Sequence, residues 1–416
     1  MAVNIPDNDP AAQSRRQWIS ASSAACCSLL SQTVWSRAAR GSSSVADADV
    51  VPRTRSEFGT LELPRFEAVA LEGLRDWLLV MDMDRDGVIW SGTTGGRFLS
   101  YTPATRQFAL HDIPAKGPIN ACLCVGDNVY LLGREYPKLR VYRRSTGRCD
   151  EYSYPAKMVN FWYGCRVIDD QHLGLFNYAG DTVLWDCRRD TGELIRYPFE
   201  GPPAGIGYIA ESGAAVYSLV FEYFADAASK YRLVKFVRLD LKQRRWSDEW
   251  AIPTTLDDTA PIRADETAGE TLWHPHLTNG MMLGFDTKHR RWTSLLEIPG
   301  HGTIFSFASS GNGTGGCGSE YRGLRFYSMS TFHGDDSRGI DGNLPHYLNG
   351  LLVFDPRSRT FDMLRLDSGT QYLQTGFTLP ANGQLYFHST NIRHPDGTFG
   401  KGLNDAEGEV LFWQPV

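Results

Sequence analysis

One pattern of short strands recurs seven times along the chain. Each copy has a short apolar run, an aromatic residue, a turn, and then a second aromatic residue that is often followed by a proline. The copies span residues 96–114, 139–149, 183–194, 233–246, 281–292, 351–361 and, in truncated form, 410–416. A repeat of about 40 to 50 residues built from short strands is typical of a ring of four-stranded blades, each burying both faces against its neighbours. The sequence therefore predicts an all-β fold, a β-propeller of seven antiparallel blades.

The spacing between copies favours a single ring. The interval is 41 residues from Tyr101 to Tyr142 and reaches 69 residues from Phe285 to Phe354. We interpret the longer intervals as loop insertions, because strand signals bounded by Gly, Asp, Asn and Pro persist in every copy. One domain, residues 51–416, is therefore expected, although a chain of 416 residues would otherwise suggest two or more.

The last copy stops before the outermost strand of its blade. The segment Phe58–Pro64 has the same pattern as the outer strand Phe108–Pro114, so we expect it to complete the final blade and close the ring. Closure removes exposed sheet edges, which would otherwise invite aggregation.

A different segment precedes the repeats. Ser14–Ile19 contains a twin arginine, and a mildly apolar stretch rich in Ser and Ala follows as far as Trp35. This order resembles a twin-arginine export signal. Residues 1–50 are therefore predicted to be an export signal and flexible leader, and the protein to be exported to the periplasm or the outside of a bacterium. A disordered tail is the alternative, and the stretch is too short and too polar to span a membrane.

Charge argues against a general affinity for nucleic acid. The net charge is −6, and the chain has no long basic block. Paired arginines recur at Arg143-Arg144, Arg188-Arg189 and Arg244-Arg245. All three pairs fall in the predicted turn between the third and fourth strands of a blade. We interpret them as solvated hairpin tips, with a charged groove as the alternative.

Six cysteines lie within the predicted ring: Cys122, Cys124, Cys149, Cys165, Cys187 and Cys317. Cys122 and Cys124 would share one face of a strand, but no second pair has the spacing of a zinc site. We expect buried core thiols, with room for one disulfide in an oxidising compartment.

Three predicted connections are long: residues 221–231, 331–349 and 390–407. Each joins the second and third strands of its blade, and in a propeller such connections surround the mouth of the central channel on one face. Loops held by a rigid scaffold are where binding and catalytic residues concentrate. We therefore expect the functional site on this face.

Histidines gather at the same place. Six of the ten histidines are predicted to lie on this rim: His274, His276, His333, His346, His388 and His394. Neutral imidazole is a common metal ligand and a common general base near neutral pH. His274, His276 and Asp335 are therefore candidate ligands of one divalent metal ion of unspecified identity. Exposed loop histidines and ordinary turn aspartates are the alternative.

A glycine-rich segment, Gly311–Gly318, falls between two predicted strands. A phosphate-binding loop would need a following helix and a suitably placed Lys, and both are missing. We interpret the segment as a flexible hairpin between the first and second strands of its blade.

The first copy also carries a family resemblance. Residues 84–93 and 97–114 resemble the repeat of the streptogramin lyase-like propellers and of their two-component-sensor relatives. The likeness spans most of the chain as a degraded repeat, and it implies a seven-bladed propeller. Streptogramin lyases open a lactone by elimination with a His and a metal, but their catalytic motif is not matched here and no residue is assigned from it. Several secreted polysaccharide lyases are similar propellers that use His, Tyr and Arg.

The leading hypothesis is an exported carbon–oxygen lyase that cleaves an acidic polysaccharide or oligosaccharide by β-elimination in the funnel of the propeller. Elimination needs a base that removes a proton next to a carboxylate and a cation that stabilises the developing enolate. The candidate catalytic residues are His333, His388 and Tyr223, and the candidate substrate-binding residues are Arg338, Arg393, Trp273 and Tyr347.

Two alternatives remain open. A non-catalytic propeller would bind a carbohydrate or a protein through its aromatic side chains, and a metal-dependent hydrolase would cleave a lactone or ester with the same rim-bound ion. The expected partner is a carbohydrate substrate or ligand, with no nucleic acid and no membrane span, and the expected assembly is a monomer.

Overall fold

The computed structural model describes most of residues 61–416. The longer ranges outside the described part are 1–60, 154–164, 176–183, 198–203, 224–230, 254–270, 277–280, 299–318, 329–349, 366–372 and 392–409, and shorter gaps occur at 75, 77, 94, 115–116, 134–137, 168, 170, 212–213 and 244. The elements assigned within the described part are all β-strands, which confirms the all-β prediction. Within the same residues, no helix is long and apolar enough to cross a membrane.

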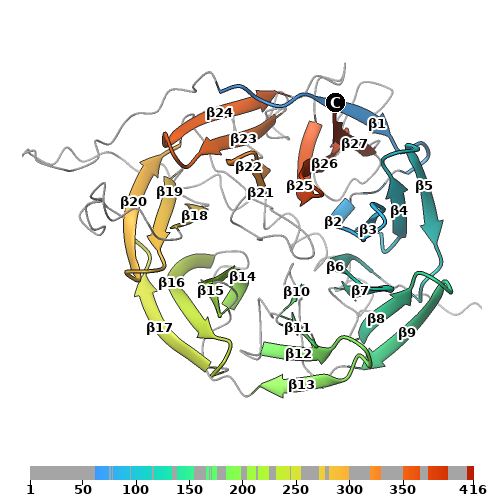
Figure 1. Ribbon diagram of the computed structural model, residues 1–416, viewed down its shortest axis with the longest axis horizontal. Coiled ribbons are helices and arrows are strands. Elements are labelled where there is room, and N and C mark those ends of the chain that lie inside the picture. Colours follow the sequence, from blue (N-terminus) through green and yellow to red (C-terminus); the bar gives the residue numbers. More distant parts are fainter. Residues whose placement is uncertain are drawn as a thin grey trace, which may run out of the picture.

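The described strands form seven antiparallel sheets, which follow one another around a common centre (Figure 1). Sheet 1 contains β2 (Leu78–Met83), β3 (Ile89–Thr93), β4 (Phe98–Thr102) and β5 (Gln107–His111). Sheet 2 contains β6 (Ile119–Val125), β7 (Asn128–Gly133), β8 (Lys138–Arg143) and β9 (Arg148–Ser153). Sheet 3 contains β10 (Cys165–Val167), β11 (His172–Leu175), β12 (Leu184–Arg188) and β13 (Leu194–Tyr197).

The second half of the chain repeats this order. Sheet 4 contains β14 (Ala204–Ala210), β15 (Ala215–Tyr223), β16 (Tyr231–Asp240) and β17 (Arg245–Ala251). Sheet 5 contains β18 (Thr271–His276), β19 (Met281–Asp286) and β20 (Arg291–Glu297). Sheet 6 contains β21 (Ser319–Tyr321), β22 (Leu324–Ser328), β23 (Gly350–Asp355) and β24 (Thr360–Arg365). Sheet 7 contains β25 (Leu373–Ala381), β26 (Gln384–Asn391), β27 (Val410–Pro415) and β1 (Phe66–Ala70).

We name the strands of each sheet A to D from the centre outward. In sheet 5 the turn between β19 and β20 has the same length as the C–D turns of the other sheets, so β18, β19 and β20 occupy positions B, C and D. The prediction that His274 and His276 lie at the end of a B strand therefore agrees with the position of β18.

An N-terminal strand does complete sheet 7, but it is not the predicted one. Strand β1 pairs with β27 from Phe66 opposite Pro415 to Ala70 opposite Leu411. Of the predicted strand 58–64, the described residues 61–64 form no strand. Pro64 has no amide hydrogen to donate to a ladder, and the Leu61 amide instead donates to Asp362 Oδ2 of sheet 6 at 2.8 Å.

Aromatic and aliphatic side chains fill the spaces between neighbouring sheets. Ring pairs with centroids 4.2 to 5.5 Å apart join sheets 1 and 2 (Trp90 and Tyr142), sheets 4 and 5 (Phe236 and Trp292), sheets 5 and 6 (Trp273 and Phe354) and sheets 7 and 1 (Phe412 and Tyr101). Leu123 and Leu173 share a core between sheets 2 and 3, and Phe326 and Phe387 share one between sheets 6 and 7. Fully burying one such side chain contributes about 1.5 to 3 kcal/mol, so this packing is a large part of the stability.

The A–B turn of sheet 6 corrects another prediction. It is formed by Arg322 and Gly323, both with positive φ (53° and 80°), which is the geometry of a tight two-residue hairpin. The glycine-rich segment Gly311–Gly318 is therefore not this hairpin. It precedes β21 in the chain and lies outside the described residues.

The described thiols agree with the prediction of buried core cysteines. Cys122 and Cys187 are buried, Cys124 and Cys149 are half-buried, and all four are thiols. Burial raises the pKa of the Cys149 thiol to about 11 and that of Cys124 well above its usual range. Thiols with raised pKa values are poor nucleophiles at neutral pH.

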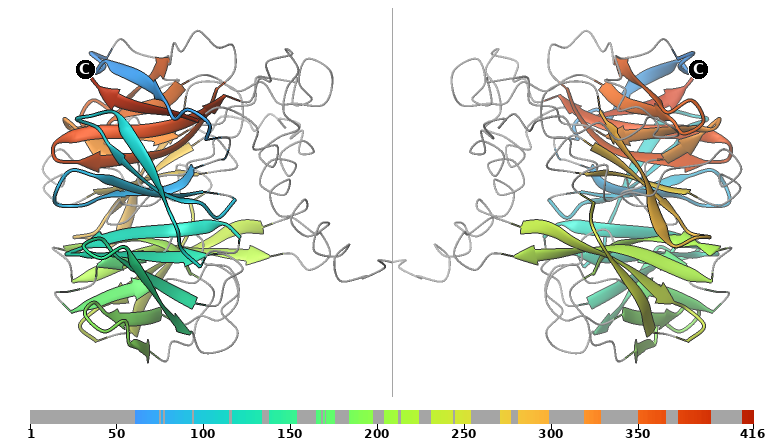
Figure 2. Two further views of the ribbon diagram at one scale, coloured as in Figure 1. Left: turned by 90° about the vertical axis from the view of Figure 1, so that its right-hand side faces the viewer. Right: turned by 90° about the vertical axis from the view of Figure 1, so that its left-hand side faces the viewer.

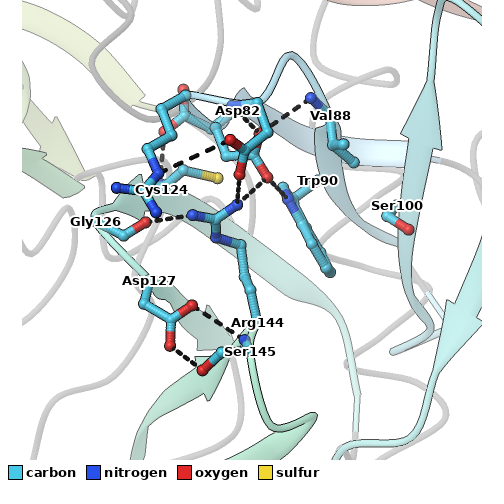
Figure 3. Close-up of polar contacts among 12 residues, drawn as sticks. Asp82, Val88, Trp90, Ser100, Cys124, Gly126, Asp127, Arg144 and Ser145 are labelled. Atoms are coloured by element: carbon cyan, nitrogen blue, oxygen red, sulfur yellow. Dashed lines mark hydrogen bonds and ion pairs between the residues drawn. The ribbon is translucent and has the colours of Figure 1, made fainter.

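An ion pair joins sheets 1 and 2. Its cation, Arg144, extends from the turn after β8 toward sheet 1 (Figure 3). Arg144 Nη1 lies 2.6 Å from Asp84 Oδ2 and 2.9 Å from Asp86 Oδ2, and Nη2 donates to the Gly126 carbonyl at 2.6 Å. Asp84 Oδ2 also accepts the indole N–H of Trp90 at 2.7 Å. The Arg144 side chain is only 10% exposed. Its interpretation as a solvated tip is wrong, because the neighbouring sheet supplies its partners.

We expect replacement of Arg144 by Gln to lower the free energy of unfolding by about 2 to 3 kcal/mol, because it leaves the buried Asp84 carboxylate without its cation. The measurement is the urea midpoint. Arg143→Gln is the matched control, since Arg143 is exposed and pairs at the surface with Asp150 at 3.3 Å, a type of pair worth about 0 to 1 kcal/mol. Equal losses in the two variants would contradict the assignment.

Candidate ligand-binding face

The two faces of the ring carry different connections. In every antiparallel sheet the A–B and C–D turns lie at one edge, and the B–C and D–A connections at the other. We call these the hairpin face and the loop face. Figure 2 places the C-terminal end of β27, at the C–D edge of sheet 7, on one side, while the β15–β16 hairpin projects on the opposite side. The long connections predicted from the sequence belong to the loop face.

The β15–β16 hairpin extends the loop face. Its strands have 9 and 10 residues, and their pairing continues past a bulge between Val220 and Phe221 to Tyr223 opposite Tyr231. In Figure 2 these strands reach beyond their neighbours. Tyr223, a predicted catalytic residue, ends β15 and therefore stands at the loop face, although its side chain lies outside the described part.

The next sheet places another candidate at the same face. His276 ends β18, opposite Met281 at the start of β19, and its side chain is also outside the described part. His276 and Tyr223 thus end the B strands of adjacent sheets.

Two other candidates in β18 are buried. Trp273 and His274 are 5% and 7% exposed. The Trp273 ring meets Phe354 edge to face at 4.9 Å between centroids and lies over Gly284, where an added Cβ would come within 2.8 Å of Trp273 Cζ3. The Trp273 ring is therefore occupied by packing between sheets 5 and 6.

His388 lies deeper still. It is in β26, opposite Phe412, and is 0% exposed. Burial penalises the imidazolium and lowers the pKa of His388 to about 3, so the ring is neutral at any ordinary pH.

The remaining candidates lie outside the described residues: His333, Asp335, Arg338, His346 and Tyr347 in 329–349, and Arg393 and His394 in 392–409. The strands that bound these segments are described. Strand β22 ends at Ser328 and β23 begins at Gly350, while β26 ends at Asn391 and β27 begins at Val410. Both segments therefore leave and rejoin the sheets at the loop face, as predicted.

A hydrogen-bond network at the loop face of sheet 1 was not predicted from the sequence. Asp76 is buried, and its carboxylate accepts the Thr93 hydroxyl at 2.5 Å and the Gly95 amide at 3.0 Å. Thr93 Oγ1 in turn accepts the Arg97 amide at 2.9 Å. This arrangement holds the B–C turn of sheet 1 in one conformation. The signal in the sequence was the pair Thr93-Thr94 followed by two glycines, with an acidic residue ahead of the A strand.

A metal site is not assembled from the described side chains. Among them, no group of three or more His, Cys, Asp or Glu residues is placed to hold a metal ion. Of the candidate ligands His274, His276 and Asp335, only His274 has a described side chain, and it is buried. The arrangement described so far is a rigid scaffold with loops and one long hairpin on a single face.

The burial of His388 predicts an acid-sensitive fold. Because the pKa is lower in the folded than in the unfolded chain, the unfolded state binds more protons below pH 6.5, and stability is lost as the pH falls from 6.5 toward about 3. We expect unfolding at pH 5 to cost about 2 kcal/mol less than at pH 8, measured by urea titration. His388→Leu should remove this pH dependence. A wild-type stability that is equal at the two pH values would contradict the prediction.

Comparison with protein-family models and with curated proteins gives no match. Solved structures are similar in fold. A streptogramin B lyase structure is 12% identical with a TM-score of 0.56, over 84% of this chain and 97% of that one. YCF48 bound to D1 peptide is 11% identical with a TM-score of 0.55, over 86% and 98%.

Two further solved structures have a similar fold. A catalytically inactive virginiamycin B lyase from Staphylococcus aureus with Quinupristin is 10% identical with a TM-score of 0.55, over 85% of this chain and 99% of that one. The extracellular domain of a putative hybrid two-component system from B. thetaiotaomicron is 13% identical with a TM-score of 0.52, over 84% and 40%. These similarities support a propeller-like fold and give no support to a polysaccharide lyase group.

Proposed function

We propose that this protein is a non-catalytic binding propeller, in which seven blades close into a single ring and the loop face binds a carbohydrate or peptide ligand. The observation that carries the proposal is the burial of the two candidate histidines whose side chains are described. His388 has no exposed surface and His274 very little, so neither can reach a substrate from its described position. A binding role needs only a rigid scaffold with a shaped face, and the proteins of similar fold include one bound to a peptide.

The single closed ring is supported by contacts at the junction of sheets 7 and 1. The Tyr101 hydroxyl donates to Gln414 Oε1 at 3.1 Å, and burial raises the pKa of Tyr101 to about 12, so the hydroxyl remains a donor. Gln414 Nε2 donates to Glu67 Oε1 at 2.9 Å, and Glu67 pairs with Arg106. These contacts connect β1, β27 and sheet 1, as a closed ring requires.

We infer in addition that the protein acts as a monomer outside the cytoplasm of a bacterium, exported through its twin-arginine segment. Arg15 and Arg16 carry this inference. Retention of an Arg15→Lys, Arg16→Lys variant inside cells that export the parent protein is the expected result.

The binding proposal predicts a ligand on glycan or peptide arrays, with affinity confirmed by calorimetry. Tyr223→Ala with His276→Ala should weaken that affinity at least tenfold, since the few residues that dominate a binding face are enriched in Tyr and each costs about 2 kcal/mol or more on truncation. The matched control is Arg322→Ala with Arg357→Ala, two exposed residues of the hairpin face, which should leave affinity unchanged. Equal affinity in both double variants would exclude the loop face.

A second candidate function is carbon–oxygen lyase activity on an acidic glycan. It is favoured by the positions of Tyr223 and His276, which end adjacent B strands on the face where the segments with His333, Arg338 and Arg393 begin and end. In this scheme His333 or Tyr223 removes the proton next to the carboxylate, and Arg338 or Arg393 neutralises the developing charge. The bond between the β-carbon and the glycosidic oxygen then breaks as a carbon–carbon double bond forms, and the departing oxygen takes a proton from the protonated base or from water.

Ultraviolet absorbance of unsaturated products tests this candidate. Incubation with uronic-acid polysaccharides, with and without chelator, should produce absorbance that disappears in a His333→Ala, Tyr223→Phe variant with an unchanged urea midpoint. Loss with chelator alone would support a divalent ion. Absence of product together with measured binding would favour the non-catalytic proposal.

A further inference from the structure

Two thiols lie next to one another along β6, the innermost strand of sheet 2 (Figure 1). Cys122 is opposite Leu131 of β7, and Cys124 is opposite Val129, so the two side chains share one face of the strand. The Cys122 thiol donates to the Trp90 carbonyl of sheet 1 at 3.7 Å. The face that carries both thiols is therefore the one that packs against sheet 1.

The two thiols are also in contact with each other. The Cys124 and Cys122 side chains form a hydrogen bond, and neither residue is joined in a disulfide. Cys122 is 0% exposed, whereas Cys124 is half-buried. A small ion thus has a path to the pair from the side of Cys124, and the Cys122 sulfur would hold that ion away from water.

The surroundings of this thiol pair are acidic as well as apolar. Asp82 of β2 is 7% exposed, and its Oδ2 accepts the Cys124 amide at 2.6 Å (Figure 3). Burial, the Cys122 thiol and the carboxylates of Asp82 and Asp84 raise the pKa of Cys124 well above its usual range. Carboxylates that disfavour a bare thiolate favour a cation bound between the two sulfurs.

One cationic side chain is already part of these surroundings. Arg144 donates to the carbonyl of Gly126, two residues after Cys124, at 2.6 Å. Arg144 also pairs with Asp84 at 2.6 Å and thereby offsets part of the acidic charge. Two thiolates with one monovalent cation carry a single net negative charge, and the guanidinium makes that charge less unfavourable here.

The number of ligands determines which class of ion the pair fits. Structural zinc sites in proteins use four ligands, and among the described residues no group of three or more His, Cys, Asp or Glu could hold a metal ion. Calcium and magnesium prefer oxygen ligands. The cuprous ion is soft and selects thiolate sulfur, and two thiolates on opposite sides of the ion are enough to hold it.

We propose that Cys122 and Cys124 bind one cuprous ion between their sulfurs. On binding, both thiols lose their protons to the solvent and two copper–sulfur bonds form, with no transfer of electrons. The ion lies between sheets 1 and 2 near the centre of the ring, so the proposal is independent of the ligand at the loop face.

The test is anaerobic titration of the purified full-length protein with Cu(I), in competition with bathocuproine disulfonate. We expect copper to be retained with two sulfur ligands in its X-ray absorption spectrum, and Zn(II) not to be retained. Because two protons leave when the ion binds, the affinity should rise about a hundredfold for each pH unit below the thiol pKa values.

Variants locate the site. Cys122→Ser with Cys124→Ser should lose the copper. Cys149→Ser with Cys187→Ser is the matched control, because it removes two other described thiols, and Cys26→Ser with Cys27→Ser removes the adjacent pair ahead of the ring. Both controls should retain copper with two sulfur ligands.

Urea midpoints verify folding of each variant. If the Cys122→Ser, Cys124→Ser protein does not fold, the pH slope and the ligand spectrum of the parent protein decide. Failure of the parent to hold copper against the competitor, loss of all copper in either control, or a spectrum without two sulfur ligands would overturn the proposal.

Discussion

The pairing of β1 with β27 is the constraint on which the rest of the ring depends. The two strands lie at opposite ends of the described chain, yet five residues of each are in register. Every other described strand pairing joins neighbours along the sequence. Among the strand ladders of the described residues, only β1–β27 joins segments far apart in the sequence, so this ladder carries the entropy of closing a very long loop. Side chains reinforce it, because Tyr101 of sheet 1 contacts both Gln414 and Phe412 of β27.

Polar contacts at the turns, as well as aromatic packing, hold several neighbouring sheets of the described chain together. The contact of Arg144 with Asp84 holds the C–D turn of sheet 2 against the A–B turn of sheet 1. The Trp292 indole donates to the Ala251 carbonyl at 2.7 Å between sheets 5 and 4. Tight turns also use residues in the left-handed region, including Arg106 and Arg290 with φ of 58° and 54°. A non-glycine residue there costs on the order of 1 kcal/mol, and in both cases the side chain pairs with an acidic residue of the adjacent sheet.

The two faces differ in their connections. The hairpin face has short turns fixed by their own carboxylates. The loop face has the long connections and the projecting β15–β16 hairpin, which suits recognition of a specific ligand.

How much of this was predictable follows from the range of the interactions involved. Alternating apolar residues and turn chemistry are local, so the sequence by itself determined the all-β fold, the seven recurring sheets and the existence of an N-terminal strand in the last of them. The identity of that strand depended on which backbone could donate to β27, and Phe66–Ala70 does so where the segment ending at Pro64 does not.

Only the tertiary structure decided which side chains are buried and which residues they pair with. Residues such as His388 and Trp273 have polar or aromatic side chains that suit a binding rim as well as a core, and only the packing of neighbouring sheets makes them buried. Arg144 looks like any exposed turn arginine until Asp84 and Asp86 of another sheet approach it. The sequence determined where strands and turns form, because those depend on adjacent residues. The tertiary structure decided which side chains face water, because that depends on residues far away in the chain.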